Sequence, residues 1–219
     1  EIDGRSIEGL ALSKVSDLLK GLPDTEVKVT IKRYGFDELF TITFIRKKIH
    51  ITGVPYYGML DENIGYIRLS NFTQDCSKDV KNALIDLKKT YSPESLILDL
   101  RGNPGGLLIE AVNVSNLFVE KGQEIVSTKG KVKQFDEKTY RVKNLPVDTQ
   151  IPLVVLVNRG SASASEIVAG ALQDIDRAVI IGTRTFGKGL VQTTRPLSYN
   201  SRLKVTTAKY YIPSGRCIQ

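Results

Sequence analysis

The chain has 219 residues, of which 41% are hydrophobic and 25% are charged, a composition that excludes disordered and collagen-like proteins. Its formal net charge is +7, but Lys and Arg are interleaved with Asp and Glu and form no basic stripe, so we expect no nucleic-acid partner. No apolar run reaches the roughly eighteen residues that a membrane-spanning helix needs, so we expect no stable membrane insertion.

The first part of the chain reads as a short helix followed by a β-hairpin. Residues 13–20 (SKVSDLLK) place apolar side chains on one helical face. Residues 26–33 and 39–45 alternate apolar and polar side chains, and the turn-forming pair Tyr34-Gly35 separates them. We therefore predict two paired strands after the helix.

Beyond this hairpin, strands alternate with helices, which is the pattern of a layered α/β domain. We predict strands at residues 64–69, 95–100, 124–127, 152–157, 178–181, 190–195 and 203–212, and helices at residues 77–91, 107–118 and 162–174. Residues 129–147 are polar and turn-rich, and we interpret them as an excursion between strands.

A single histidine, His50, limits the chemistry that the chain can perform. A His-based triad or a multi-His metal site would have to include this residue, which lies in an alternating segment far from any serine-rich turn. Cys76 and Cys217 lack CxxC spacing, and they permit one disulfide without indicating it. We expect neither a metal ion nor a cofactor.

A serine-rich turn joins the apolar strand at residues 152–157 to an apolar helix. Its small side chains allow close approach of a substrate backbone, and a helix N-terminus supplies unpaired N–H groups where an oxyanion would form. The turn contains Ser161, Ser163 and Ser165. Helix capping explains one serine, so the excess favours a functional role.

A serine hydroxyl is a weak nucleophile and needs a base. Lys188 is the better candidate for this base, because Gly187 and Gly189 flank it and allow close approach. Burial among apolar neighbours would favour the neutral amine, although a solvated lysine is the common alternative. Gln192 follows at an even offset, which on a strand places both side chains on one face, so we expect its amide oxygen to orient the amine.

A second glycine cluster follows the predicted strand at residues 95–100. It lies between the carboxyl end of that strand and the next helix, where ligand sites of open α/β sheets collect. We expect Gly105 or Gly106 to donate one hydrogen bond to an oxyanion and Ala164 to donate the other. A plain tight turn is the alternative interpretation.

These segments together resemble the C-terminal processing peptidases, or tail-specific proteases, of serine peptidase family S41. The motifs LDLR with the following Gly-Gly, then GSASASEI, then TFGKG with Gln192, match in order and spacing over about residues 60–219. The resemblance implies that Ser163 is the nucleophile, Lys188 the general base and Gln192 its orienting partner. It also implies an α/β fold with the spiral ββα core of ClpP and crotonase-like enzymes.

The same resemblance divides the chain into two parts. It implies that residues 1–48 are the C-terminal half of a PDZ domain and that residues 49–219 are the peptidase core. The implied partner is an unfolded or extended polypeptide, bound through its C-terminal tail as an added strand. The implied location is an export compartment, the periplasm or cell envelope. We expect the chain to be a piece of a longer protein, because the sequence stops in mid-pattern at Gln219.

Two other functions compete with a serine endopeptidase. The series Gly182-x-x-x-x-Gly187-Lys188 nearly matches a phosphate-binding loop, but Gly189 replaces the hydroxyl residue that would hold Mg²⁺, and a predicted strand follows instead of a helix. The other alternative is a non-catalytic scaffold that binds peptides, and the presence of Ser163, Lys188 and Gln192 together argues against it.

Overall fold

The computed structural model describes residues 1–49, 52–132 and 137–219. The chain separates into two compact units, Glu1–Ile51 and Thr52–Gln219. His50, which any His-based catalytic or metal site would have to include, lies outside the described residues.

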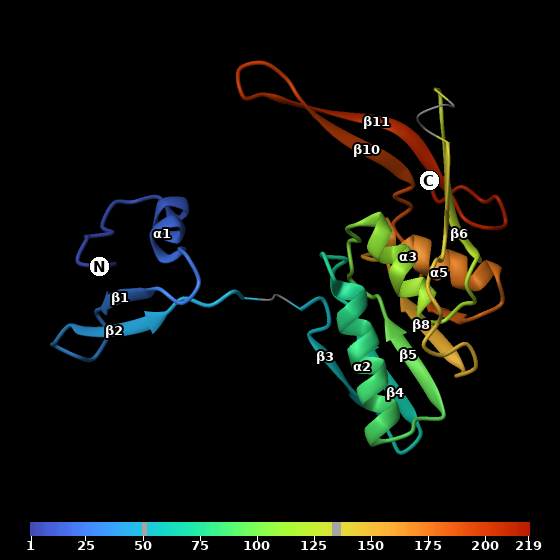
Figure 1. Cartoon of the computed structure of the whole chain (residues 1–219), viewed down its shortest axis with the longest axis horizontal. Helices are drawn as coiled ribbons and strands as arrows, with labels where there is room; N and C mark the ends of the chain where they lie inside the picture. The colour runs from blue at the N-terminus through green and yellow to red at the C-terminus, as the bar shows by residue number, and fades with distance from the viewer. Residues whose placement is uncertain (50–51, 133–136) are drawn as a thin grey trace. The chain divides into compact units, whose positions relative to one another are not determined.

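Within residues 1–49, the first unit contains one helix and one hairpin (Figure 1). Helix α1 spans Leu12–Leu19, and strand β1 (Glu26–Ile31) pairs antiparallel with β2 (Phe40–Ile45). These elements confirm the predicted ones to within about two residues at each end. The Arg46 guanidinium joins them, because it donates hydrogen bonds to the carbonyl oxygens of Leu19 at 2.9 Å and Glu26 at 2.6 Å.

The described residues of the second unit form two sheets. The five-stranded sheet has the order β3-β4-β5-β8-β9, in which β3 is antiparallel to β4 and the other neighbours are parallel. Its strands are β3 (Tyr56–Met59), β4 (Ile64–Arg68), β5 (Ser95–Asp99), β8 (Leu153–Val157) and β9 (Val179–Gly182). The antiparallel sheet has the order β10-β11-β6-β7, formed by β10 (Leu190–Pro196), β11 (Arg202–Tyr211), β6 (Glu124–Gly130) and β7 (Lys138–Arg141).

The core of this unit lies between its helices and the parallel sheet. The helices are α2 (Cys76–Thr90), α3 (Leu108–Asn116) and α5 (Ala164–Asp174). On α2, the buried side chains Val80, Ala83, Leu84 and Leu87 recur at helical spacing, so the sequence period directs one face inward. On β5, Leu96 and Leu98 are fully buried while Ile97 between them is half-buried, as a period of two requires. The unit is therefore a mixed α/β fold, as predicted.

Two strands differ from the sequence prediction. Strand β7 lies inside residues 129–147, which we interpreted as an excursion between strands, and β6 extends to Gly130 to pair with it. Strand β3 was not predicted either. Both are four-residue edge strands whose stability comes from main-chain pairing with a neighbour, so neither shows a clear apolar alternation.

Candidate active site

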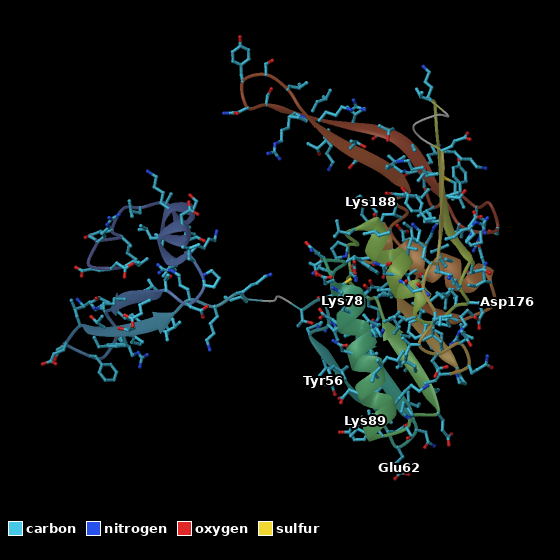
Figure 2. All side chains as sticks on the ribbon, viewed as in Figure 1. Tyr56, Glu62, Lys78, Lys89, Asp176 and Lys188 are labelled. Carbon is cyan, nitrogen blue, oxygen red and sulfur yellow. The ribbon has the colours of Figure 1, made fainter. Side chains whose placement is uncertain are left out.

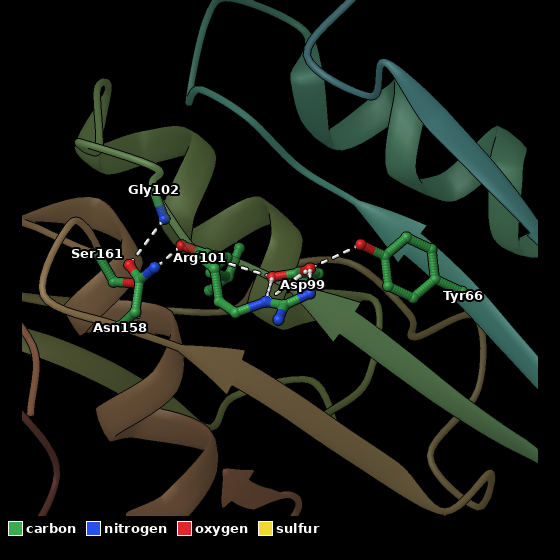
Figure 3. Close-up of polar contacts among 7 residues, drawn as sticks. Tyr66, Asp99, Arg101, Gly102, Asn158 and Ser161 are labelled. Carbon is green, nitrogen blue, oxygen red and sulfur yellow. Dashed lines mark hydrogen bonds and ion pairs between the residues drawn. The ribbon is translucent and has the colours of Figure 1, made fainter. Parts of the chain in front are cut away.

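Two loops lie side by side at the carboxyl ends of β5 and β8. Because these strands are parallel neighbours, the chain leaves both at the same edge of the sheet. The Gly102 N–H donates to the Asn158 side-chain oxygen at 2.9 Å, a contact drawn in Figure 3. The Ala162 N–H donates to the Asn103 carbonyl oxygen at 3.0 Å. The predicted glycine loop and the predicted serine turn therefore form one structure.

The three serines of the turn have different environments. Ser161 is fully buried, and its hydroxyl donates to the Leu100 carbonyl oxygen at 2.8 Å. Ser165 is also fully buried, and its hydroxyl donates to the Asn103 carbonyl oxygen at 2.9 Å. Ser163 between them is half-buried. Two serines thus bind the glycine loop, and Ser163 is the one of the three that is not fully buried.

The backbone of Ser163 has an uncommon conformation. Its φ is 56°, in the left-handed region that residues with a Cβ seldom occupy, and it stands immediately before α5. Such strained backbone persists only where surrounding contacts enforce it, and it is frequent at nucleophilic serines that follow a strand. Here the hydrogen bonds of Ser161 and Ser165 to the glycine loop hold the backbone on both sides of Ser163.

The expected oxyanion donors are not equivalent. The Gly105 N–H donates to the Asn103 side-chain oxygen at 2.9 Å, so it is already engaged. Within the described part of the chain, the N–H groups of Gly106 and Ala164 have no hydrogen-bond partner. Gly105 instead contributes by its lack of a side chain, because a Cβ there would lie 2.9 Å from the Ala164 nitrogen.

Glu166 connects the serine turn to the loop that carries Lys188. Its side chain is buried, and its carboxylate accepts three main-chain hydrogen bonds. The Oε2 atom accepts from the N–H of Ser163 at 2.8 Å and from the N–H of Lys188 at 2.8 Å. The Oε1 atom accepts from the N–H of Gly187 at 2.5 Å. Glu166 was not predicted from the sequence, although the spacing Ser-x-x-Glu at a helix start is a capping-box signal that points to it.

The main chain around Lys188 is held on its other side by the last residues of the chain. The Gly189 N–H donates to the Gln219 side-chain oxygen at 3.1 Å, and the Gly189 carbonyl accepts from Tyr210 at 2.8 Å. A Cβ at Gly189 would lie 2.2 Å from the Gln219 nitrogen. Glycine is therefore required at position 189 by this internal contact.

Two details of the Lys188 environment differ from the expectations. Lys188 is exposed rather than buried among apolar neighbours, near the base of the β10–β11 hairpin (Figure 2). Strand β10 begins only at Leu190, and its pairing with β11 is irregular between Val191 and Gln192. Strand alternation therefore does not place Lys188 and Gln192 on one face. A strand after Lys188 does confirm that this loop cannot open the helix that a phosphate-binding loop requires.

An ion pair between the buried Asp99 carboxylate and the exposed Arg101 guanidinium fixes the start of the glycine loop (Figure 3). Asp99, at the end of β5, accepts hydrogen bonds from the Arg101 Nη2 atom at 2.6 Å, the Arg101 main-chain N–H at 2.8 Å and the Tyr66 hydroxyl at 2.6 Å. Burial alone would raise the pKa of Asp99, but these hydrogen bonds and the Arg101 charge outweigh it and hold that pKa below its ordinary value. Asp99 therefore stays ionised and keeps the turn in place.

The described residues contain no group of three or more His, Cys, Asp or Glu side chains arranged to hold a metal ion. Cys76 and Cys217 are both free thiols. None of the helices in the described ranges combines the length and the apolar character needed to span a membrane.

Comparison with known proteins identifies relatives over the whole chain. The model of Peptidase family S41 matches residues 63–219. A carboxy-terminal-processing protease of Bartonella bacilliformis is 46% identical over 100% of this chain and 50% of its own length. A probable CtpA-like serine protease of Staphylococcus aureus is 39% identical over 100% of this chain and 43% of its own length. Among solved structures, the photosystem II D1 C-terminal processing protease is similar with a TM-score of 0.69 and 36% identity, covering 100% of this chain and 59% of that one. The chain thus spans about half the length of the curated relatives it matches.

Proposed function

Because the chain belongs to peptidase family S41, we propose that it is a serine endopeptidase that cleaves polypeptides near their C-terminus, with Ser163 and Lys188 as its catalytic dyad. One observation carries this assignment. The Glu166 carboxylate binds the main-chain N–H groups of both Ser163 and Lys188, although the two residues belong to different loops. The proposed nucleophile and base are therefore neighbours in the folded chain.

The proposed reaction is acyl transfer. The neutral Lys188 amine takes the proton from the Ser163 hydroxyl, and the hydroxyl oxygen attacks the scissile carbonyl carbon. The charged lysine then protonates the leaving amine, and the acyl group stays on Ser163. Water hydrolyses this ester with the same lysine as base. We assign to Gln192 the orientation of the amine, by contact of its amide oxygen with the Lys188 Nζ atom.

The tetrahedral intermediates need donors for their negative oxygen. We assign this role to the N–H groups of Ala164 and Gly106, because the Gly105 N–H is already bound to Asn103. Ala164 is the first residue of α5, so its N–H also lies at the positive end of the helix dipole. This placement supports a site that stabilises an oxyanion directly beside Ser163.

The wider architecture and substrate belong to the same proposal. We assign residues 49–219 to a ClpP/crotonase-like spiral core, supported by the parallel order β4-β5-β8-β9 with helices in the connections. We assign residues 1–48 to the C-terminal half of a PDZ domain. In support, only Ile2 and Val27 are buried hydrophobic side chains among the described residues of that unit, as expected of part of a larger lobe. The substrate would be an extended polypeptide held by its C-terminal tail, in the periplasm or cell envelope.

A peptidase assay tests the proposal. The full-length wild-type protein, Ser163→Ala and Lys188→Ala are each incubated with an unstructured protein that has an apolar C-terminus. We expect cleavage near that C-terminus by the wild type alone, with a covalent acyl-enzyme on Ser163 detectable by mass spectrometry. Equal cleavage by all three proteins would rule out the dyad. Binding of the tail with no cleavage by the wild type would support a non-catalytic scaffold instead.

A further inference from the structure

Glu166 has more hydrogen bonds than its place in a helix requires. A carboxylate in the first turn of a helix commonly accepts one N–H of its own helix start, and here that donor is Ser163. The two further donors, Gly187 and Lys188, come from a loop that follows β9. The extra bonds therefore bind the serine turn to a distant part of the chain.

We infer that Glu166 is a positioning residue that sets the separation of Ser163 and Lys188 for the reaction. This inference rests on the proposed function, because it assigns Glu166 a part in a reaction between those two residues. A single atom, Oε2, accepts from both amide nitrogens, each at 2.8 Å. The two nitrogens consequently lie no farther apart than twice that distance, whatever their side chains do.

The charge and burial of Glu166 suit it to this role. An ionised carboxylate only accepts hydrogen bonds, and its two oxygens offer about four lone-pair positions, enough for three N–H donors. Its side chain is 6% exposed, so water does not compete strongly for those positions. Bonds to an ionised acceptor are also roughly twice as strong as neutral ones. Ile167 and Val168, the next residues of α5, are buried in the core, which anchors the first turn of the helix that carries Glu166.

The isosteric substitution Glu166→Gln separates this role from simple packing. A glutamine has one acceptor oxygen and one NH₂ group, and the NH₂ group would face an N–H. With its oxygen at the Oε2 position, glutamine keeps the hydrogen bonds from the Ser163 and Lys188 N–H groups, but its NH₂ group repels the Gly187 N–H. This repulsion pushes Gly187, and with it the adjoining Lys188, away from the serine turn. With the opposite orientation, the hydrogen bonds from Ser163 and Lys188, which set the separation, are both lost. A displacement of about 1 Å in a catalytic group can lower kcat by roughly 100-fold.

The matched control is Glu110→Gln. Glu110 is also 6% exposed and accepts a main-chain N–H at a helix start, from Ser77 at 2.9 Å. It accepts nothing from the loop at residues 187–188. Loss of its negative charge should therefore lower stability in a similar way without moving Lys188.

The experiment measures kcat, KM and the thermal midpoint of the full-length wild type, Glu166→Gln and Glu110→Gln, with Ser163→Ala as the inactive reference. We expect both glutamine variants to melt at lower temperature and only Glu166→Gln to lose kcat, by about 10- to 100-fold, with KM changed less than about threefold. Hydrogen exchange should be faster at the amides of Gly187 and Lys188 in Glu166→Gln alone.

Several results would overturn the inference. It fails if Glu166→Gln keeps the wild-type kcat, if Glu110→Gln loses as much, or if exchange at Gly187 and Lys188 is unchanged. Should Glu166→Gln not fold, Glu166→Asp retains both oxygens on a shorter arm and must also lose kcat. Cleavage by Ser163→Ala at the wild-type rate would instead show that the proposed function itself is wrong.

Discussion

Gly105 lies so close to Ser163 that a Cβ built on Gly105 would stand 2.9 Å from the Ser163 Cβ and 2.6 Å from the Ala162 carbonyl oxygen. These separations are shorter than carbon and oxygen atoms tolerate without movement. The absence of a side chain at position 105 therefore determines how closely the glycine loop approaches the serine turn.

Gly105→Ala should abolish most of the activity, because the added methyl group pushes the serine turn away from the glycine loop. Gly122→Ala is the matched control, since Gly122 has nearly the same φ, +94° against +95°, with nothing within 4 Å of its Cβ position. Both variants carry the backbone strain of a positive φ, of order 1 to 3 kcal/mol. The rate at which a fluorophosphonate labels Ser163 distinguishes them, and equal rates would contradict the close approach.

Ser163→Ala and Ser165→Ala should differ in their effect on the chemistry. Ser165→Ala removes one of the two donors of the buried Asn103 carbonyl, which keeps the Ala162 N–H, so we expect the free energy of unfolding to fall by about 0.5 to 1.5 kcal/mol while labelling persists. Ser163→Ala should abolish labelling, and its loss of stability should stay within the roughly 0.5 to 2 kcal/mol of a substituted helix N-cap. Denaturant titrations and labelling of both variants check this, and labelling of Ser163→Ala would exclude Ser163 as nucleophile.

Activity should rise with pH from about 6 to 9, because only an uncharged lysine amine accepts a proton from the serine hydroxyl. The measurement is kcat across this range, with the thermal midpoint followed in parallel so that loss of fold is recognised. A flat profile would argue against a lysine base. Lys188→Arg, which keeps the charge but holds its proton throughout this range, should stay inactive at every pH.

Stability should decrease in acid through Asp99. Its pKa is below the ordinary 3.8 in the folded protein, so the ionised form favours folding above that value. This contribution is present above pH 3.8 and is lost as the pH falls through the lower, folded pKa. Asp99→Asn should lower the free energy of unfolding at pH 7 and flatten its further loss as the pH falls below the ordinary pKa of 3.8. Denaturant titrations at several pH values decide this, and parallel curves for both proteins would contradict it.

The sequence predicted most elements of the fold because burial imposes a visible period on them. The helix at residues 76–90 and the strand at residues 95–99 each place one apolar face against the same core, and both patterns survive in the local sequence. Strand β7 was not predicted because its only requirement is a main-chain partner, which leaves no mark on side-chain composition. The serine turn and the glycine loop were found for a different reason: close approach excludes side chains, so small residues accumulate there.

The parts of the candidate site that escaped prediction depend on contacts between distant segments. Nothing near Glu166 in the sequence reveals that residues 187 and 188 lie against it. The same limit applies to Lys188, since its flanking glycines indicate that another segment packs closely against the backbone but do not identify that segment. At Gly189 the neighbour is the Gln219 main chain, and Lys188 itself is exposed. The irregular pairing at Gln192 likewise arises from β10 and β11 together. It could not be foreseen from the alternation of residues along β10 alone.

The hydrogen bonds at residues 187–189 all use main-chain N–H groups, so they do not depend on which side chain the central residue carries. A chain with methionine in place of Lys188 would retain the same loop and the same Ser163 turn while lacking a base. On the proposed function, such a chain should bind a polypeptide substrate without cleaving it. Because main-chain hydrogen bonds hold this loop, the proposed base can be replaced without loss of the local structure.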